Sequence, residues 1–210
     1  MDKKKINDAL SKALADKGKR KFAQSMEFIV NFRGIDFAKA ENRLNLDILL
    51  PKGKGKEQKV VVFADGQIAF EAKNVGANEV IDNAGITKMA TDRKKVKELA
   101  RMSEFIAQPN MMVTVGKSLG QVLGAKGKLP RPIVGQVKDA VEQARRRVRM
   151  ASKGKYLPVA QCVIGSESMS VEDLAENFDT VYEKVKAKVL EPSIKSVYVK
   201  LSMGKPVKVA

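Results

Sequence analysis

Alternation of apolar and polar residues predicts β-strands near both ends of the chain. The clearest cases are residues 25–32 and 43–50, where nearly every second residue is apolar. Residues 157–164 and 197–209 are rich in β-branched residues and are predicted to be strands as well, the last one broken at residues 202–206. Strands of the alternating kind bury one face and expose the other, so they predict a sheet that is covered on one side.

Helical periodicity predicts two amphipathic helices, one near each end of the chain. Residues 3–17 carry an apolar face, and Gly18 favours termination there. A second helix begins after Ser170, a typical N-cap residue, and ends before Pro192. The predicted core positions are Ile6, Ala9, Leu10, Ala13 and Leu14 in the first helix and Leu174, Phe178, Val181, Val185, Val189 and Leu190 in the second.

The pattern changes in the middle of the chain. Residues 59–64 form a β-branched run without alternation, which is typical of a strand buried on both faces. From about Ile68 to Arg149, predicted helices alternate with short strands, which favours a small α/β domain with a parallel sheet. The predicted helices are residues 69–74, 93–102, 111–123 and 134–147, and the predicted strands lie near residues 79–81 and 105–107. Gly116, Gly120 and Gly124, spaced by four, predict close packing of their helix against a neighbour.

Elements of the first kind thus flank elements of the second kind. This order predicts a domain inserted into an outer domain in which the two chain ends meet. The predicted fold class is therefore α/β with two domains.

Charge is the strongest feature of the composition. The 210 residues carry a formal net charge of +16, which points to a polyanionic partner rather than to a particular fold. Residues 126–155 hold ten basic and two acidic residues, densest at residues 145–149, and suit either a solvated helix end or RNA contact. The loop 52–56 has three lysines and is predicted to be flexible, either merely solvated or in contact with phosphates.

Several classes of protein are excluded or disfavoured. No apolar run approaches the roughly 20 residues of a membrane span, and the basic N-terminus lacks the apolar core of a signal peptide, so we expect a cytosolic protein without a membrane partner. The chain has no histidine and one cysteine, Cys162, which excludes a Cys/His zinc site and an internal disulfide. Cys162 lies in an apolar run and is predicted to be a buried small hydrophobe.

No catalytic constellation is recognisable, and we expect neither a cofactor nor a metal. Residues 115–118 end like a phosphate-binding loop, but the required glycine is replaced by Met111. No Gly-x-Gly-x-x-Gly follows a strand, so dinucleotide binding has no support.

The break in the last strand is the most distinctive local feature. Ser202 offers a hydroxyl, Met203 a soft apolar tip and Lys205 a charge, while Gly204 lets another backbone come close. These groups suit an RNA ribose, base and phosphate. The competing interpretation is an ordinary turn at the end of a strand.

Three short stretches resemble the ribosomal protein L-one family, in its archaeal type. They follow one another in the family's order and spacing, and the resemblance extends over nearly the full length of the chain. Residues 21–27, Lys-Phe-Ala-Gln-Ser-Met-Glu, are similar to the family's Lys-Phe-x-x-[Ser/Thr]-x-Glu. Residues 124–132, Gly-Ala-Lys-Gly-Lys-Leu-Pro-Arg-Pro, resemble its Gly-Pro-Arg-Gly-x-[Met/Leu]-Pro-Asn-Pro. Residues 202–206, Ser-Met-Gly-Lys-Pro, are similar to its Thr-Met-Gly-Pro, with a lysine inserted before the proline.

The resemblance implies a specific architecture. The outer domain, residues 1–65 and 154–210, would be an α+β sandwich-like domain containing both termini. The inserted domain, residues 66–153, would be a Rossmann-like, three-layer α/β domain. The linkers would lie near residues 64–68 and 149–155.

The resemblance also implies a function. The family binds large-subunit ribosomal RNA at the mobile stalk, many members repress translation of their own messenger RNA, and the stalk acts on exit-site transfer RNA. We therefore expect a non-enzymatic protein, monomeric when free. The RNA-binding residues carried over from the family motifs are Lys21, Phe22, Glu27, Ser202, Met203 and Gly204.

Each of these residue types suits RNA. The Ser202 hydroxyl can exchange hydrogen bonds with a 2′-hydroxyl, and Phe22 and Met203 can cover ribose or base faces. The Glu27 carboxylate can accept from a hydroxyl or an exocyclic amine, or orient Lys21.

Two alternatives remain open from the sequence. One is a nonspecific basic protein that coats nucleic acid, in which binding tracks charge alone. The other is a phosphate-handling α/β enzyme built on the middle segment, for which Met111 breaks the only candidate loop.

Overall fold

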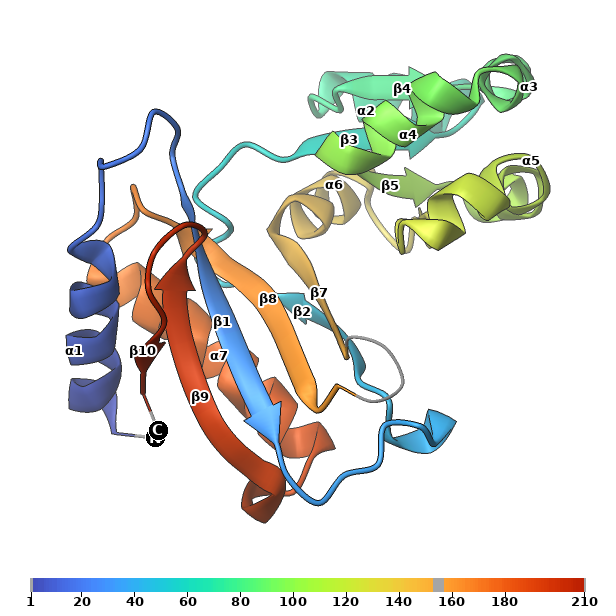
Figure 1. The fold of residues 1–210 in the computed structure, drawn as a ribbon. Helices are drawn as coiled ribbons and strands as arrows, with labels where there is room; N and C mark the ends of the chain where they lie inside the picture. The colour runs from blue at the N-terminus through green and yellow to red at the C-terminus, as the bar shows by residue number, and fades with distance from the viewer. Residues whose placement is uncertain (1, 153–156, 210) are drawn as a thin grey trace. The chain divides into compact units, whose positions relative to one another are not determined.

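The computed structural model describes residues 2–152 and 157–209, and the chain divides into two compact units (Figure 1). The outer unit consists of Met1–Lys56 and Arg146–Ala210, and the inserted unit of Glu57–Arg145. Each unit has its own sheet and its own hydrophobic core.

The outer unit is built on a six-stranded sheet whose strand pairs are all antiparallel. In sheet order the strands are β10 (Val207–Lys208), β9 (Ile194–Leu201), β1 (Ser25–Phe32), β8 (Val159–Ser166), β7 (Arg147–Ser152) and β2 (Asn45–Leu49). Strand β1 pairs with β9 on one side and with β8 on the other, although all three are far apart in sequence.

Two helices cover one face of this sheet, α1 (Lys3–Leu14) and α7 (Val171–Lys188) (Figure 1). Alternate residues of β1 are buried beneath them, as the sequence pattern predicts. The rings of Phe28 on β1 and Phe178 on α7 meet edge to face at 5.1 Å, the geometry that aromatic pairs prefer. The opposite face of β1 stays only half-buried.

The inserted unit is a three-layer α/β structure. Its parallel sheet has the order β4 (Glu79–Ile81), β3 (Lys59–Phe63), β5 (Ser103–Ala107) and β6 (Arg131–Pro132). One face packs on α3 (Asn83–Thr91), α4 (Arg93–Met102) and α5 (Met112–Ala125), and the other on α2 (Gly66–Asn74) and α6 (Val137–Arg146). Short 3₁₀ helices lie at Ala40–Asn42, Pro109–Met111 and Glu191–Ser193.

The predicted α/β fold class is confirmed, but the compact units differ from the predicted boundaries. Strand β3 was expected in the outer domain, yet it pairs with β4 and β5 in the inserted unit. Its burial on both faces requires helices on both faces, which only that unit supplies. Strand β7 was expected in the inserted domain, yet it pairs with β2 and β8. The second predicted boundary, at residues 153–154, and part of the linker 149–155 lie outside the described residues.

Other local predictions were also wrong. Helix α3 and strand β7 are not among the predicted elements, and the helix predicted at residues 134–147 ends one residue inside β7. Leu190, a predicted core residue of α7, follows the helix and is 79% exposed. A Cβ at Gly116 or Gly120 would meet no heavy atom within 4 Å, so these glycines do not mediate close packing among the described residues.

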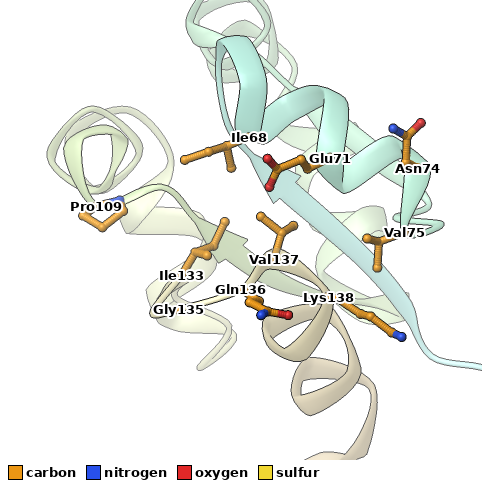
Figure 2. A pocket seen from close by; sticks show the side chains of 10 residues that line it. All are labelled: Ile68, Glu71, Asn74, Val75, Pro109, Ile133, Gly135, Gln136, Val137 and Lys138. Atoms are coloured by element: carbon orange, nitrogen blue, oxygen red, sulfur yellow. The ribbon is translucent and has the colours of Figure 1, made fainter.

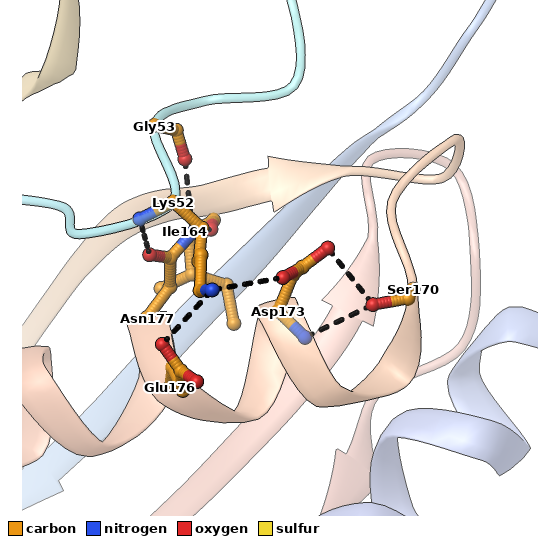
Figure 3. A network of polar contacts seen from close by, with 7 residues as sticks. All are labelled: Lys52, Gly53, Ile164, Ser170, Asp173, Glu176 and Asn177. Atoms are coloured by element: carbon orange, nitrogen blue, oxygen red, sulfur yellow. Dashed lines mark hydrogen bonds and ion pairs between the residues drawn. The ribbon is translucent and has the colours of Figure 1, made fainter.

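The basic loop between β2 and β3, which the sequence predicts to be flexible, is tied to α7 by hydrogen bonds (Figure 3). The fully buried Asn177 side chain on α7 accepts a hydrogen bond from the Lys52 backbone N–H at 3.1 Å. Its amide donates to the carbonyl oxygens of Gly53 and Ile164 at 2.9 and 2.7 Å. Gly55, at a φ of +65°, packs so closely that a Cβ would lie 2.6 Å from the Met169 side chain.

We predict that Asn177→Ala lowers the free energy of unfolding by about 2–3 kcal/mol, because it leaves one N–H and two carbonyl groups without these partners. Chemical denaturation measures this. The matched control is Glu176→Ala on the same helix, whose carboxylate lies 3.6 Å from the Lys52 ammonium. This pair is solvent-exposed, so its removal is expected to cost less than about 1 kcal/mol. Equal losses in the two variants would contradict the role of Asn177.

Cys162 is buried on β8, as predicted, and burial raises the pKa of its thiol to about 12. The thiol is therefore protonated at pH 8, and the thiolate is the reactive form. We predict that a maleimide does not label the folded protein at pH 8 and labels one thiol per chain after denaturation, as measured by intact mass. Rapid labelling of the folded protein would contradict the burial.

Candidate nucleic-acid interface

The break in the last strand is a reversal of the chain. Strand β9 ends at Leu201, and the chain turns back so that Val207 of β10 pairs with Val199 of β9. The Gly204 N–H donates to the Leu201 carbonyl at 2.8 Å within this turn. A Cβ on Gly204 would come within 3.2 Å of the Leu201 Cβ, so a glycine fits the turn closely. We call residues 202–206 the corner.

The corner is fastened to Ser25, the first residue of β1, and to residues 21–24, which we call the segment before β1. The Ser202 backbone N–H and its hydroxyl donate to the Ser25 carbonyl oxygen at 3.0 and 3.3 Å. The Met203 N–H donates to the side-chain oxygen of Gln24 at 3.0 Å. Gln24 is 1% exposed, and its amide nitrogen donates to the carboxylate of Glu167 at 3.4 Å. The Met203 backbone is therefore fixed while its side chain stays 64% exposed.

Lys21 and Phe22 precede Gln24 by three and two residues, and both are exposed. The Phe22 ring is 50% exposed. The buried Gln24 side chain accepts a hydrogen bond from the Met203 N–H and so joins the segment before β1 to the corner. The exposed side chains of Phe22 and Met203 lie on these two joined segments. Large exposed apolar groups beside cations are typical of a surface that contacts bases or sugars.

Glu27 lies next to the corner on the half-buried face of the sheet. In the strand register it stands opposite Lys200 of β9 and Val163 of β8. The Lys200 ammonium donates to the Ser202 carbonyl oxygen at 3.1 Å. Lys200, which stands opposite Glu27, is thereby linked to the corner. Within the described residues the Glu27 carboxylate makes no hydrogen bond or ion pair, and it does not contact Lys21 in this way either. It can therefore accept hydrogen bonds from a ligand.

Positive charge gathers at the end of α1 and the corner. Asp16 accepts a hydrogen bond from the Lys19 ammonium at 2.5 Å. This bond and the Lys19 charge lower the pKa of Asp16, and the charges of Lys205 and Arg20 add to the effect. Lys205 of the corner therefore acts on the same carboxylate as the basic run that leads to Lys21.

Two contributors to this site have no recognisable sequence signal. Gln24 occupies a variable position in the motif at residues 21–27, yet it carries the bond to Met203. The Lys56 ammonium donates to the Ala23 carbonyl oxygen and, at 3.2 Å, to the Ser25 hydroxyl. Both contacts join residues that are more than thirty positions apart, which no local pattern reveals.

The basic stretch 126–155 is divided between the two units. Lys128 is paired with the largely buried Glu104, and the Arg145 guanidinium donates to the Gly76 carbonyl oxygen at 2.7 Å. Arg149 lies on β7 and donates to the Asn45 side chain at 2.8 Å. Much of its charge is thus engaged in protein contacts, and Lys153 and Lys155 lie outside the described residues.

A groove of about 510 Å³ lies between α2 and α6 of the inserted unit (Figure 2). Its walls carry the aliphatic side chains of Ile68, Val75, Ile133 and Val137. Glu71 and Lys138 also line it, and a single lysine offset by a carboxylate does not suit a phosphate, which needs several cations or converging backbone N–H groups. The described residues contain no group of three or more Cys, Asp or Glu side chains that could hold a metal, and no helix among them is long and apolar enough to span a membrane.

Comparison with known proteins gives a single answer. The sequence profile of the Ribosomal protein L1p/L10e family matches residues 11–205. The "Large ribosomal subunit protein uL1" of Thermofilum pendens is 43% identical over 210 residues, which cover 98% of this chain and 92% of the relative. Proteins of the same name from Methanocella arvoryzae and Archaeoglobus fulgidus are 37% and 38% identical and cover this chain completely. They cover 100% and 99% of those relatives.

These relatives are named as proteins of the large ribosomal subunit, which is a non-enzymatic assignment. The match extends through both units and includes the segment before β1 and the corner up to Lys205. The chain therefore belongs to the ribosomal protein L1p/L10e family.

Proposed function

We propose that this chain, by its family an RNA-binding protein of the large ribosomal subunit, binds ribosomal RNA of the mobile stalk through the corner and the segment before β1. The observation that carries the proposal is the attachment of the corner to Gln24 and Ser25. It fixes the backbone at Ser202 and Met203 and leaves their side chains partly or largely exposed. A site that is ordered before binding loses less conformational entropy when it binds.

The polar groups of the site are suited to ribose. The Ser202 hydroxyl uses its hydrogen to donate to the Ser25 carbonyl, so its lone pairs are available to accept from a 2′-hydroxyl. Glu27, which lacks a side-chain partner among the described residues, can accept from a second hydroxyl or an exocyclic amine. A carboxylate repels phosphate, so its presence favours contact with sugar or base over a site built for phosphates alone.

The apolar and cationic groups of the site suit different parts of an RNA. Phe22 and Met203 can cover ribose or base faces, while Lys21 and Lys205 are exposed and can meet phosphates. A nonspecific coat would need the cations alone. The fixed corner with its hydroxyl, carboxylate and apolar tips supports recognition of one RNA structure.

Three finer statements belong to the same proposal. The site that binds ribosomal RNA also binds the chain's own messenger RNA and represses its translation. The stalk containing the protein acts on exit-site transfer RNA during its release. The free protein is a cytoplasmic monomer.

The test of the main site is a double substitution, Ser202→Ala/Met203→Ala. We expect it to weaken stalk RNA binding by about 1–3 kcal/mol, because it removes a hydroxyl contact and an apolar cover. The slope of log affinity against log salt should hardly change, since no cation is lost. Fluorescence anisotropy across a salt series, with an unrelated RNA duplex as second ligand, measures both quantities.

The matched control is Leu190→Ala/Ser193→Ala, which removes an exposed apolar side chain and a half-buried serine hydroxyl before the start of β9, at the other end of that strand from the corner. It should leave stalk RNA binding unchanged. If wild type binds stalk RNA and the unrelated duplex equally, with no effect of the corner variant, the protein is a nonspecific coat and the proposal fails.

Self-repression is tested in a cell-free translation reaction programmed with the protein's own messenger RNA. Added wild-type protein is expected to lower synthesis from this message and not from an unrelated one. The Ser202→Ala/Met203→Ala protein should need a higher concentration by roughly the factor that it loses on stalk RNA, about 5–150-fold for 1–3 kcal/mol. Equal repression of both messages by the two proteins would exclude a shared RNA site.

A further inference from the structure

Helix α4 of the inserted unit carries an unusual concentration of positive charge. Five of its ten residues are basic and exposed, Arg93, Lys94, Lys95, Lys97 and Arg101, and Glu98 is its only carboxylate. Val96 and Ala100 face the core, and Lys94, Lys97 and Arg101 lie outside that face. Lys94, Lys97 and Arg101 fall within about 60° of arc at 100° per residue and span about 10 Å along the axis. They form a stripe directed away from the unit's core.

Most of this charge does not stabilise the helix, and only Arg101, in the last turn, suits the helix macrodipole. Arg93, Lys94 and Lys95 occupy the first turn, which has no acidic residue, and cations there oppose the helix macrodipole. Lys97 adds like-charge pairs with Arg93 and Lys94, which also destabilise a helix. None of the five cations takes part in an ion pair within the described part of the chain. The N-cap Asp92 places one carboxylate at this end of the helix, where it accepts hydrogen bonds from the Lys94 and Lys95 backbone N–H groups at 3.1 Å. The three first-turn cations exceed it in number, so the surplus charge calls for a partner.

Net positive charge is concentrated on one face of the inserted unit. The helices α3, α4 and α5 carry seven cations and one carboxylate, and the N-cap residues Asp82 and Asp92 add two carboxylates. On the other side of the sheet, α2 and α6 carry four cations and three carboxylates, and the N-cap residue Asp65 adds one more. Net charge spread for solubility would have no reason to favour one layer, whereas a surface that docks on a polyanion does.

We propose that the α4 face is a second nucleic-acid surface, which binds the phosphate backbone of duplex RNA without reading its sequence. It belongs to the inserted unit, whereas the corner belongs to the outer unit. Duplex nucleic acid presents about one charge per 1.7 Å of its axis, so a stripe of about 10 Å faces several phosphates. The stripe has no row of exposed apolar residues that would insert into a membrane, and this favours RNA.

This surface requires no base contact and therefore differs in kind from the corner. Its contribution should be strongly salt-dependent, with log affinity changing by about 0.7–0.9 per decade of salt for each neutralised phosphate. The inference adds to the proposed function and does not rest on it, because duplex binding by α4 can be measured whether or not the corner recognises stalk RNA.

The first experiment compares two variants of the full chain with equal charge loss. Lys94→Gln/Lys97→Gln removes two cations from α4, and Lys73→Gln/Lys138→Gln removes two exposed cations from α2 and α6. Each protein is saturated with unlabelled stalk RNA and titrated into a labelled, unrelated RNA duplex of about 20 base pairs at several salt concentrations. Proteins without stalk RNA are titrated in parallel.

The α4 variant is expected to bind the labelled duplex about tenfold more weakly at about 0.1 M salt, with a slope shallower by about 1.4–1.8. The control variant should change affinity less than about twofold. The melting temperature of the α4 variant should stay the same or rise, because first-turn cations and like-charge pairs are removed. Equal losses in both variants, or no binding of the labelled duplex by wild type, would overturn the proposal.

A second experiment locates the RNA. Cys162 is buried with its pKa raised to about 12, so an introduced exposed cysteine can be labelled selectively with a photoactivatable maleimide. Glu98→Cys places the label among the α4 cations, and Asp139→Cys places it on exposed α6 with the same change of charge. We expect several-fold more cross-linked duplex from Glu98→Cys. Equal yields from both positions would contradict a surface on α4.

Discussion

The antiparallel ladder that places β1 between β8 and β9 is the constraint on which the outer unit depends. It joins the first strand of the chain to strands that follow the whole inserted unit, so the outer core forms only when distant parts of the chain pair. The ladder also brings the residues before β1 next to the residues after β9. The corner and the segment holding Lys21 and Phe22 become neighbours through this register.

Two buried amide side chains hold the loops around this sheet in place through hydrogen bonds. Gln24 satisfies the Met203 N–H and donates to Glu167, while Asn177 satisfies groups of the loop before β3 and of β8. A buried polar side chain stabilises a structure only when its hydrogen bonds are made, so each amide specifies one arrangement of its loop. Loops that would otherwise be mobile thus gain fixed backbones, and the exposed side chains on them keep their positions before any ligand arrives.

Periodic sequence signals predicted the parts of this fold that are periodic. The alternation in residues 25–32 matches β1 at both ends, and the helix predicted at residues 93–102 matches α4 at both ends. The missed elements lacked such a signal. Helix α3 is nine residues long and includes Gly85, and β7 begins in a run of arginines that resembles a helix terminus. The contacts of Gln24 and Lys56 depend on tertiary register and could not be predicted from neighbouring residues.

The lysines and arginines of this chain separate into two groups when their environments are compared. Lys52 lies 3.6 Å from Asp173 and Glu176, Lys128 is paired with Glu104, and these cations hold loops and layers in place. Three cations of α4 stand in its first turn, where they oppose their own helix, and the α4 cations lack ion-pair partners within the described residues. Charge that costs stability persists when an interaction outside the chain offsets the cost. A docking surface is therefore recognised by the places where cations lack compensating carboxylates, rather than by the total net charge of +16.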